Sequence, residues 1–150
     1  MNELLSKLQI QTAHLFDLSP LRRLEKICFP LDAWPLMDMI GALSFPNIVR
    51  YKALWEGEMI AFIAGEIRYP SRTGWIATVC VHPDHRRKGI ARTLISMTEE
   101  EMGQPRVRLT VRATNYAAIN LYRADGYVEI DRWVKYYKGE EDAIVMEKIR

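Results

Sequence analysis

Apolar and polar residues alternate through the middle of the chain, which is the pattern of half-buried strands. Strands are predicted over residues 48–55 and 59–69, joined by a hairpin turn at residues 56–58, and over residues 75–81 after a second turn at 70–74. The short connections make these three strands antiparallel. With a further strand near residues 10–15, the first half of the chain is expected to be dominated by an antiparallel meander.

Between the other predicted strands, apolar residues recur at the spacing of a helix. Ser19 is expected to cap a helix that has Pro20 at its first position and ends before Pro30. The remaining elements are predicted as helices over residues 36–43, 89–102 and 115–125 and strands over residues 106–111, 127–137 and 142–148. The helix between the fourth and fifth strands makes that pair parallel. We expect one α/β domain of the α+β type over residues 1–150, with a mixed, mostly antiparallel sheet of about seven strands and about four helices.

Composition and charge exclude several classes of protein. The chain has 150 residues, is 49% hydrophobic and carries a formal net charge of +2, which is too small to indicate nucleic-acid binding. No apolar run reaches the ~18 residues that a membrane span needs. The first residues lack the basic and apolar segments of a signal peptide, so we expect a cytoplasmic protein without a membrane partner. The two cysteines and three histidines show no metal-ligand spacing, and we expect no metal site.

A predicted strand-to-helix turn near residues 82–89 combines basic side chains with a glycine. Gly89 has no Cβ, so a ligand can approach the backbone closely, and Ala91 keeps the next turn of the helix slim. The free amides at a helix N-terminus carry partial positive charge, which suits a phosphate or pyrophosphate. Further positive charge comes from Arg86, Arg87, Lys88 and Arg92. The pattern alone leaves open either an anion site or a solvated basic turn before an ordinary helix.

The pattern Arg86-x-x-Gly89-x-Ala91, preceded by Val81-x-Pro83, resembles the coenzyme A signature of the GNAT acetyltransferases. The resemblance implies the GNAT fold and acetyl-CoA as acetyl donor, with the amides of the turn holding its pyrophosphate. It also implies that the preceding strand pairs with the pantetheine arm and that the Val81 amide polarises the thioester carbonyl. The cofactor-binding residues implied here are Val79, Cys80, Val81, Arg86, Arg87, Lys88, Gly89, Ile90, Ala91 and Arg92.

The segment from Val111 to Tyr127 resembles the second motif of the same family, with Asn115 and Tyr122 at the family's spacing. On its own, Asn115 is typical of a helix N-cap; the resemblance adds contact with the cofactor arm. On its own, Tyr122 is typical of a core aromatic residue. The resemblance makes Tyr122 the catalytic residue that protonates the departing coenzyme A thiolate, which a neutral phenol can do.

Within the family, the chain resembles the ribosomal-protein-alanine N-acetyltransferases, in Phe29-Pro30, in residues 109–115 and in the tail over residues 136–146. This likeness implies that the acceptor is a protein N-terminus and that the last hairpin helps to form the peptide groove. One position departs from that subfamily: Thr110 stands where those enzymes carry a catalytic glutamate. Because a threonine hydroxyl is no base at neutral pH, the base is expected to be Glu66, His82 or water.

Several alternatives stay open. The acceptor can instead be a small amine or a lysine side chain, selected by a groove shaped by residues 29–45 and 130–142, and the loss of the glutamate permits a non-catalytic acyl-CoA-binding module. Direct transfer in a ternary complex is expected, with Cys80 as the alternative acyl-carrying nucleophile. The four charges of the basic turn do not favour nucleic acid as a partner. A monomer and a homodimer are both compatible with the sequence. Candidate groove residues are Trp34, Met37, Met39 and Phe45.

Overall fold

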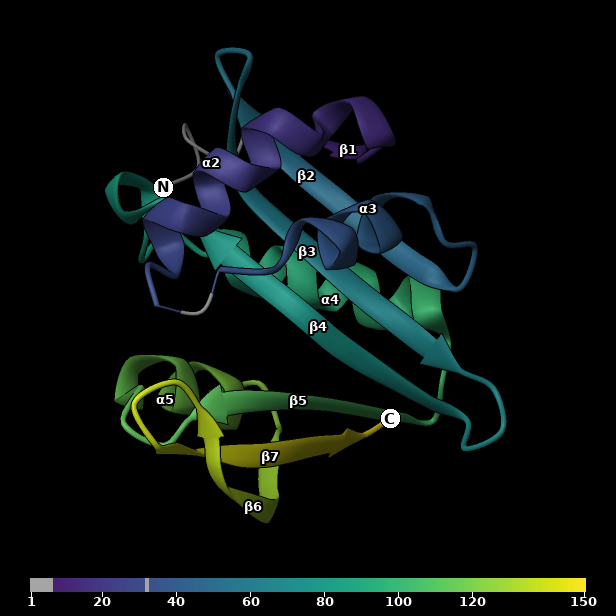
Figure 1. Cartoon of the computed structure of the whole chain (residues 1–150). Coiled ribbons are helices and arrows are strands. Elements are labelled where there is room, and N and C mark those ends of the chain that lie inside the picture. The colour runs from purple at the N-terminus through teal and green to yellow at the C-terminus, as the bar shows by residue number, and fades with distance from the viewer. Residues whose placement is uncertain (1–6, 32) are drawn as a thin grey trace.

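The computed structural model describes residues 7–31 and 33–150 and contains a seven-stranded mixed sheet in the order β1-β2-β3-β4-β5-β7-β6 (Figure 1). The strands are β1 (Gln9–Thr12), β2 (Ile48–Trp55), β3 (Glu58–Arg68), β4 (Thr73–Val81), β5 (Arg106–Arg112), β6 (Val128–Tyr137) and β7 (Glu141–Ile149). Neighbouring strands are antiparallel except β4 and β5, which are parallel. The predicted mixed and mostly antiparallel sheet is therefore confirmed.

The helices cover both faces of this sheet. Those in the described residues are α2 (Leu18–Cys28), α3 (Leu36–Ser44), α4 (Ile90–Met102) and α5 (Tyr116–Ala124), with short 3-10 turns at η1 (Leu15–Asp17) and η2 (Pro83–His85). One core cluster joins α4 and α5 to one face, and a second joins α2 and α3 to the other. Apolar residues at alternate positions of β5 pack in the first cluster, which leaves the residues between them, Thr110 among them, on the face of α2 and α3.

The start of α2 differs from the prediction. The helix begins at Leu18 with Asp17 as its N-cap residue, rather than at Pro20 after Ser19. The Asp17 carboxylate accepts hydrogen bonds from the backbone N–H of His14 and from Nζ of Lys52, both at 2.8 Å. These contacts turn the chain before Ser19, and they also end β1 earlier than expected, because η1 occupies residues 15–17.

Other helix ends follow the sequence signals. Asn115 caps α5 by accepting a hydrogen bond from the Ala118 amide at 3.2 Å, as its residue type predicts. Gly103 takes the left-handed conformation after α4, with φ at 62°.

Two glycines allow α4 to lie close against the sheet. A Cβ at Gly65 would lie 2.7 Å from Thr98 Cγ2, and one at Gly74 would lie 2.7 Å from Met102 Cε. A Cβ at either position would force these neighbours to move, so the absence of side chains at Gly65 and Gly74 favours the close approach of α4 to β3 and β4. This close packing holds the last turns of α4 against β3 and the start of β4. In the part of the chain that the structure describes, no helix has the length and apolar character needed to cross a membrane.

Candidate active site

The parallel strands β4 and β5 separate partway along their length. Pairing joins Thr73–Ile76 to Arg106–Leu109. Beyond this point β4 runs on to Val81 and β5 to Arg112 without pairing to each other, and the two strands diverge toward their C-terminal ends (Figure 1). We call the opening between these two unpaired ends the split. It exposes strand edges whose backbone groups are available to a ligand.

A β-bulge lies where the strands part. The neighbours Ala64 and Gly65 on β3 pair with Thr78 and Ile76 on β4, so Ala77 is an extra residue in β4. A bulge bends its strand and increases the local twist. Because pairing with β5 stops at Ile76, the bulge accounts for the direction in which β4 turns away.

The end of β4 presents alternate backbone amides to the split. The His82 N–H donates to the Ile60 carbonyl on β3 at 2.7 Å. Since backbone directions alternate along a strand, the amides of Val81 and Val79 point away from β3 and toward the split. The amide of Cys80 points to β3, and its side chain is buried in the core beneath α2 and α3. Of the three predicted residues, Val79 and Val81 therefore offer their amides to the split.

The turn after β4 leaves the first amides of α4 uncapped. Gly89 is the N-cap residue, with φ at 80° and no side-chain hydrogen bond to the helix, and Arg87 also has a positive φ, of 61°. A Cβ at Gly89 would meet no atom within 4 Å, so the backbone conformation and not crowding calls for glycine. The amides of Ile90, Ala91 and Arg92 are thus unpaired donors at the positive end of a helix. The Ile90 side chain is buried in the core, and the Ala91 side chain packs against it.

The basic side chains of the turn have different partners. Arg86 donates from Nε to the Val81 carbonyl at 3.0 Å, which ties the turn to the end of β4. Arg92 lies 3.9 Å from the Asp125 carboxylate, beyond α5. Arg87 and Lys88 are exposed, and neither forms an ion pair with another described residue. Their charge is therefore available to an anion at the start of α4.

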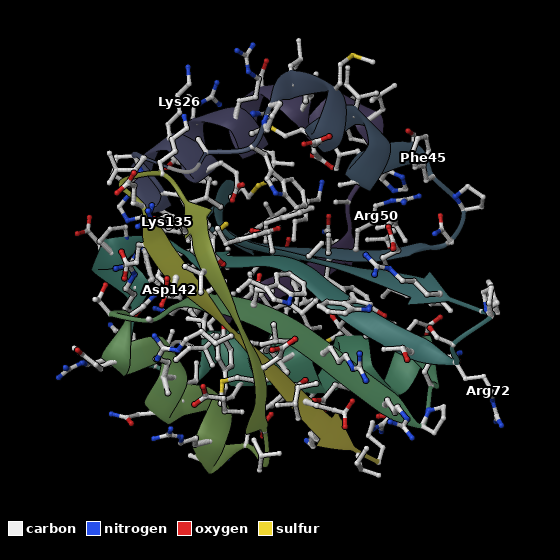
Figure 2. The ribbon with its side chains drawn as sticks, turned by 60° about the horizontal axis from the view of Figure 1, so that its bottom comes forward. Lys26, Phe45, Arg50, Arg72, Lys135 and Asp142 are labelled. Atoms are coloured by element: carbon white, nitrogen blue, oxygen red, sulfur yellow. The ribbon has the colours of Figure 1, made fainter. Side chains whose placement is uncertain are left out.

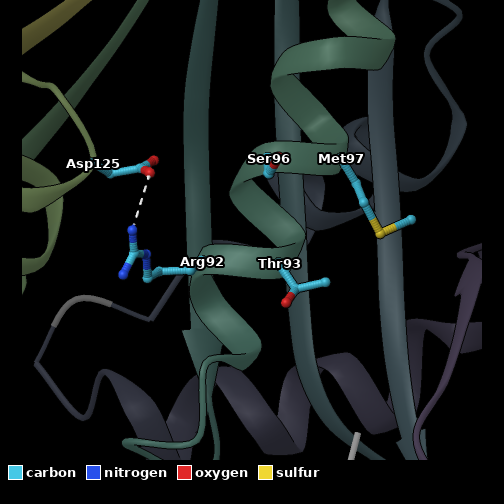
Figure 3. Close-up of a pocket in the computed structure, with 5 residues that line it drawn as sticks. All are labelled: Arg92, Thr93, Ser96, Met97 and Asp125. Carbon is cyan, nitrogen blue, oxygen red and sulfur yellow. Dashed lines mark ion pairs between the residues drawn. The ribbon is translucent and has the colours of Figure 1, made fainter. Parts of the chain in front are cut away.

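An open depression of about 380 Å³ adjoins this turn, on the solvent side of α4 (Figure 3). It is lined by Arg92, Thr93, Ser96, Met97 and Asp125. The Arg92–Asp125 ion pair crosses one side of it. The depression begins at Arg92, in the first turn of α4, and offers room for part of an extended ligand.

Tyr122 faces the core from α5 and belongs to the same cluster as Val81, Ile90 and Val111. Its side chain is 8% exposed, and its ring packs edge-to-face on Tyr127 with centroids 6.0 Å apart. Burial, with a smaller effect from Tyr137, raises the pKa of Tyr122 to about 12. The phenol therefore keeps its proton at any physiological pH, which a proton donor requires. Tyr122 therefore shares one core cluster with the last residue of β4 and the first residue of α4.

A further group of side chains lies on the α2–α3 side of the split. Tyr137, the last residue of β6, donates from its hydroxyl to Oγ1 of Thr110 at 3.1 Å. The Arg112 guanidinium lies 5.0 Å from the centre of the Tyr137 ring. The sequence indicated Tyr137 only as part of the tail over residues 136–146 and gave it no role of its own. The alternation along β5 puts Thr110 and Arg112 on one face, but nothing local places Tyr137 beside them.

The two expected bases have other partners. Glu66 forms an ion pair with Arg68 at 2.5 Å and pairs across strands with Trp75, in the region where β4 and β5 are still joined. His82 Nδ1 accepts a hydrogen bond from the Asp84 amide at 3.1 Å. A neutral His82 with this bond carries its proton on Nε2 and presents a donor there. Both contacts argue against these residues as the base.

The Cys80 thiol is unsuited to carry an acyl group. It is 3% exposed, and its contact with the Cys28 thiol together with burial raises its pKa well above the usual value. A nucleophilic thiol needs the opposite shift. The acidic neighbour Glu25, itself 1% exposed, adds to the effect through its negative charge and through a side-chain hydrogen bond with Cys80.

The candidate groove residues divide into two kinds. Met39 is buried in the core under α3, and Trp34 packs against the same cluster. Met37 and Phe45 are exposed, at 73% and 59%. Among the described residues, no three His, Cys, Asp or Glu side chains gather as a metal centre would require.

Comparisons with known proteins find relatives over most of the chain. An N-alpha-acetyltransferase of Sulfolobus acidocaldarius is 28% identical over 152 residues, which cover 92% of this chain and 90% of that protein. The [ribosomal protein bS18]-alanine N-acetyltransferase of Escherichia coli strain K12 is 33% identical over 104 residues, which cover 65% of this chain and 69% of that protein.

Solved structures share the fold along nearly the whole chain. The ribosomal-protein-S18-alanine N-acetyltransferase of Escherichia coli superposes with a TM-score of 0.85 at 26% identity, covering 95% of this chain and 93% of that one. Arabidopsis thaliana NAA60 in complex with acetyl-CoA gives a TM-score of 0.82 at 23% identity, covering 95% and 98%. The sequence profile of the acetyltransferase (GNAT) family matches residues 18–127, more than half of the chain. This chain therefore belongs to the acetyltransferase (GNAT) family.

Proposed function

We propose that this chain transfers the acetyl group of acetyl-CoA directly to the N-terminal α-amine of a protein or peptide. The observation that carries the proposal is the split beside the uncapped start of α4. In this proposal the strand-edge amides of β4, the unpaired amides of α4 and the protonated phenol of Tyr122 surround one opening. Each of these three parts suits a different portion of an acyl thioester carrier.

The diphosphate is bound at the turn from Arg86 to Arg92. The unpaired amides after Gly89 donate to its oxygens, and the exposed charges of Arg87 and Lys88 neutralise it. The depression along α4 takes the neighbouring nucleotide portion. The pantetheine arm extends from there into the split, where the Val79 amide pairs with it as a neighbouring strand would.

The acetyl group lies at the inner end of that arm, beside Val81. Its amide donates to the thioester oxygen and stabilises the negative charge that develops when the amine attacks. The C–S bond then breaks, and the thiolate takes a proton from the Tyr122 hydroxyl. Asn115 acts through its cap, which holds the start of α5 and hence the position of Tyr122.

The acceptor class follows from the relatives and from the amine. The two curated relatives described above are named as N-alpha-acetyltransferase and as an alanine N-acetyltransferase of a ribosomal protein. A free α-amine has a pKa near 8 and a lysine side chain near 10.4. At pH 7 to 8 a far larger fraction of α-amines is neutral, so a site without a strong base favours them.

Mass spectrometry of peptides tests the proposal. Each peptide in a pool with varied first and second residues carries a free α-amine and one internal lysine, and a matched pool has a blocked N-terminus. We expect coenzyme A release and an acetyl group on the α-amine, only in the first pool. Acetylation of the lysine in both pools, or of small amines alone, would overturn the acceptor. Tight acetyl-CoA binding without turnover on any amine would instead indicate a binding module.

A further inference from the structure

Thr110 is the first residue of β5 beyond its pairing with β4, so its side chain stands at the mouth of the split. It is half-buried and lies on the face opposite α4 and α5. The hydroxyl of Tyr137 donates to Thr110 Oγ1 at 3.1 Å. A phenol that donates its proton to Thr110 faces other groups as a hydrogen-bond acceptor.

An irregular hairpin places Tyr137 there. In the β6–β7 ladder, Trp133 pairs with Ala143 and Tyr137 with Glu141, so three residues of β6 oppose one residue of β7. Within this bulge Lys135 has a φ of 53°, in the left-handed region. The Asp142 carboxylate accepts the Lys135 amide at 3.0 Å and holds the bulge; Figure 2 labels both residues at the hairpin. Backbone strain held by a dedicated contact is typical of functional sites.

The same hairpin is anchored to β5 by Arg112. Its guanidinium donates to the Glu141 carboxylate at 2.6 Å and to the Lys138 carbonyl at 3.1 Å, while it lies over the Tyr137 ring. Hydrogen bonds from Thr114, and then from Arg112, lower the pKa of the Glu141 carboxyl. This carboxylate is engaged in holding the hairpin, so it is a poor base. The hairpin side chain that contacts Thr110 is the phenol of Tyr137.

Tyr137 also influences the proposed proton donor. After burial, it is the second cause of the raised pKa of Tyr122, and both effects favour the neutral phenol of Tyr122.

On the basis of the proposed function, we propose that Thr110 is a positioning residue that holds the Tyr137 hydroxyl to accept the N–H of the incoming α-amine. The two hydroxyls then act as a relay in the place of a carboxylate base. The amine enters neutral and forms the N–C bond as the C–S bond breaks. Its proton passes to Tyr137 Oη while the Tyr137 proton passes to Thr110 and the Thr110 proton to water. The thiolate takes the Tyr122 proton, which water replaces, so one proton leaves and one enters.

A relay of neutral hydroxyls cannot store the proton of an ammonium group, because the conjugate acids of hydroxyls are very strong. The α-amine must therefore lose that proton to solvent before it binds. The pH dependence of kcat/KM is then expected to follow the pKa of the acceptor rather than the pKa of an enzyme group.

Three variants test the positioning role. Thr110→Val keeps the shape of the side chain and removes the hydroxyl, Thr110→Ser keeps the hydroxyl and removes the methyl group, and Tyr137→Phe removes the phenol. We expect Thr110→Val and Tyr137→Phe each to lower kcat on a peptide by 10- to 100-fold, with acetyl-CoA affinity within twofold of the parent. Thr110→Ser should retain activity within threefold. The double variant with Thr110→Val and Tyr137→Phe should have a kcat no lower than that of the less active single variant. Thr73→Val, at the paired end of β4 with its hydroxyl on the Ser71 carbonyl, is the matched control.

If Thr110→Val were as active as the parent and Thr110→Ser were impaired, the role of Thr110 would be packing of its methyl group and not positioning of Tyr137. A second measurement uses two peptides whose α-amines differ in pKa by about one unit. Midpoints of kcat/KM that shift together with the acceptor support the relay, whereas one fixed midpoint for both peptides overturns it and reveals an enzyme base. Absence of peptide acetylation by the parent would refute the proposed function itself. Normal acetylation in all three variants would refute only the role of Thr110 and Tyr137.

Discussion

Replacement of Gly89 by glutamate is expected to abolish tight binding of acetyl-CoA while leaving the fold intact. Gly89 has a φ of 80°, and a Cβ there meets no atom within 4 Å. The loss in folding stability is therefore limited to the strain of a left-handed conformation, about 1 kcal/mol. For a chain of this size that strain lowers Tm by about 2–4 °C.

The loss in affinity is larger, because the new carboxylate stands at the proposed diphosphate site. A unit charge about 6 Å from a doubly charged diphosphate, at an effective dielectric constant of about 40, costs about 3 kcal/mol. That energy weakens Kd about 100-fold. Gly89→Ala adds the strain without the charge, so its Kd should change by less than about fivefold.

Gly57→Glu is the matched control. Gly57 is at the tip of the β2–β3 hairpin, has a φ of 83° and likewise has no atom within 4 Å of a built Cβ. Titration calorimetry with acetyl-CoA should give the parent affinity for Gly57→Glu, and the thermal shifts of both glutamate variants should agree. A Gly89→Glu variant that binds within threefold of the parent would refute the assignment of the diphosphate to the start of α4.

Three further variants test other parts of the structure. Tyr122→Phe should lower kcat far more than acetyl-CoA affinity, and an equal loss of kcat and affinity would make Tyr122 structural. Because the pKa of Tyr122 is about 12, the parent should show no alkaline loss of activity from this group below about pH 11. Tyr127→Phe removes a 2.6 Å hydrogen bond to the buried Glu99 carboxylate, so thermal unfolding should show a loss of about 2 kcal/mol, or roughly 4–8 °C in Tm. Glu25→Gln should raise Tm at pH 8, because burial raises the pKa of Glu25 in the folded state above its usual value of 4.5, which makes ionisation destabilising as pH rises. The gain should shrink as pH falls toward 4.5, and a gain independent of pH would contradict this account.

The regular parts of the fold were accessible from the sequence. The alternation in β2 and β5 and the helical spacing in α3 gave bounds that differ from the structure by at most one residue. The Asn115 cap followed from its residue type, because a capping bond is made within three residues. The predicted start of α2 was wrong because a long-range contact determines where this helix begins. Asp17 is fixed by Lys52, which lies 35 residues away, and a local signal at Ser19 cannot compete with that contact.

For the candidate site, the sequence supplied the turn and helix residues but missed the shape of the opening. Arg86 to Gly89 form the turn and Ile90 to Arg92 the first residues of α4, one residue from the predicted helix start at Gly89. The split itself depends on an extra residue at Ala77, and alanine has no preference that would reveal a bulge. Strand patterning predicts regular ladders and is insensitive to one residue more or less on one strand.

The second irregularity has the same origin and a larger consequence. Lys135 adopts a left-handed conformation that its residue type does not favour, and the side chain of Asp142 on the next strand accepts its amide. Without that bulge Tyr137 would continue the alternation of β6, and its hydroxyl would not reach Thr110, 27 residues earlier in the chain. The two bulges therefore have different roles. One opens the sheet for the cofactor, and the other brings a hydroxyl to the opposite side of the opening, where the acceptor amine must enter.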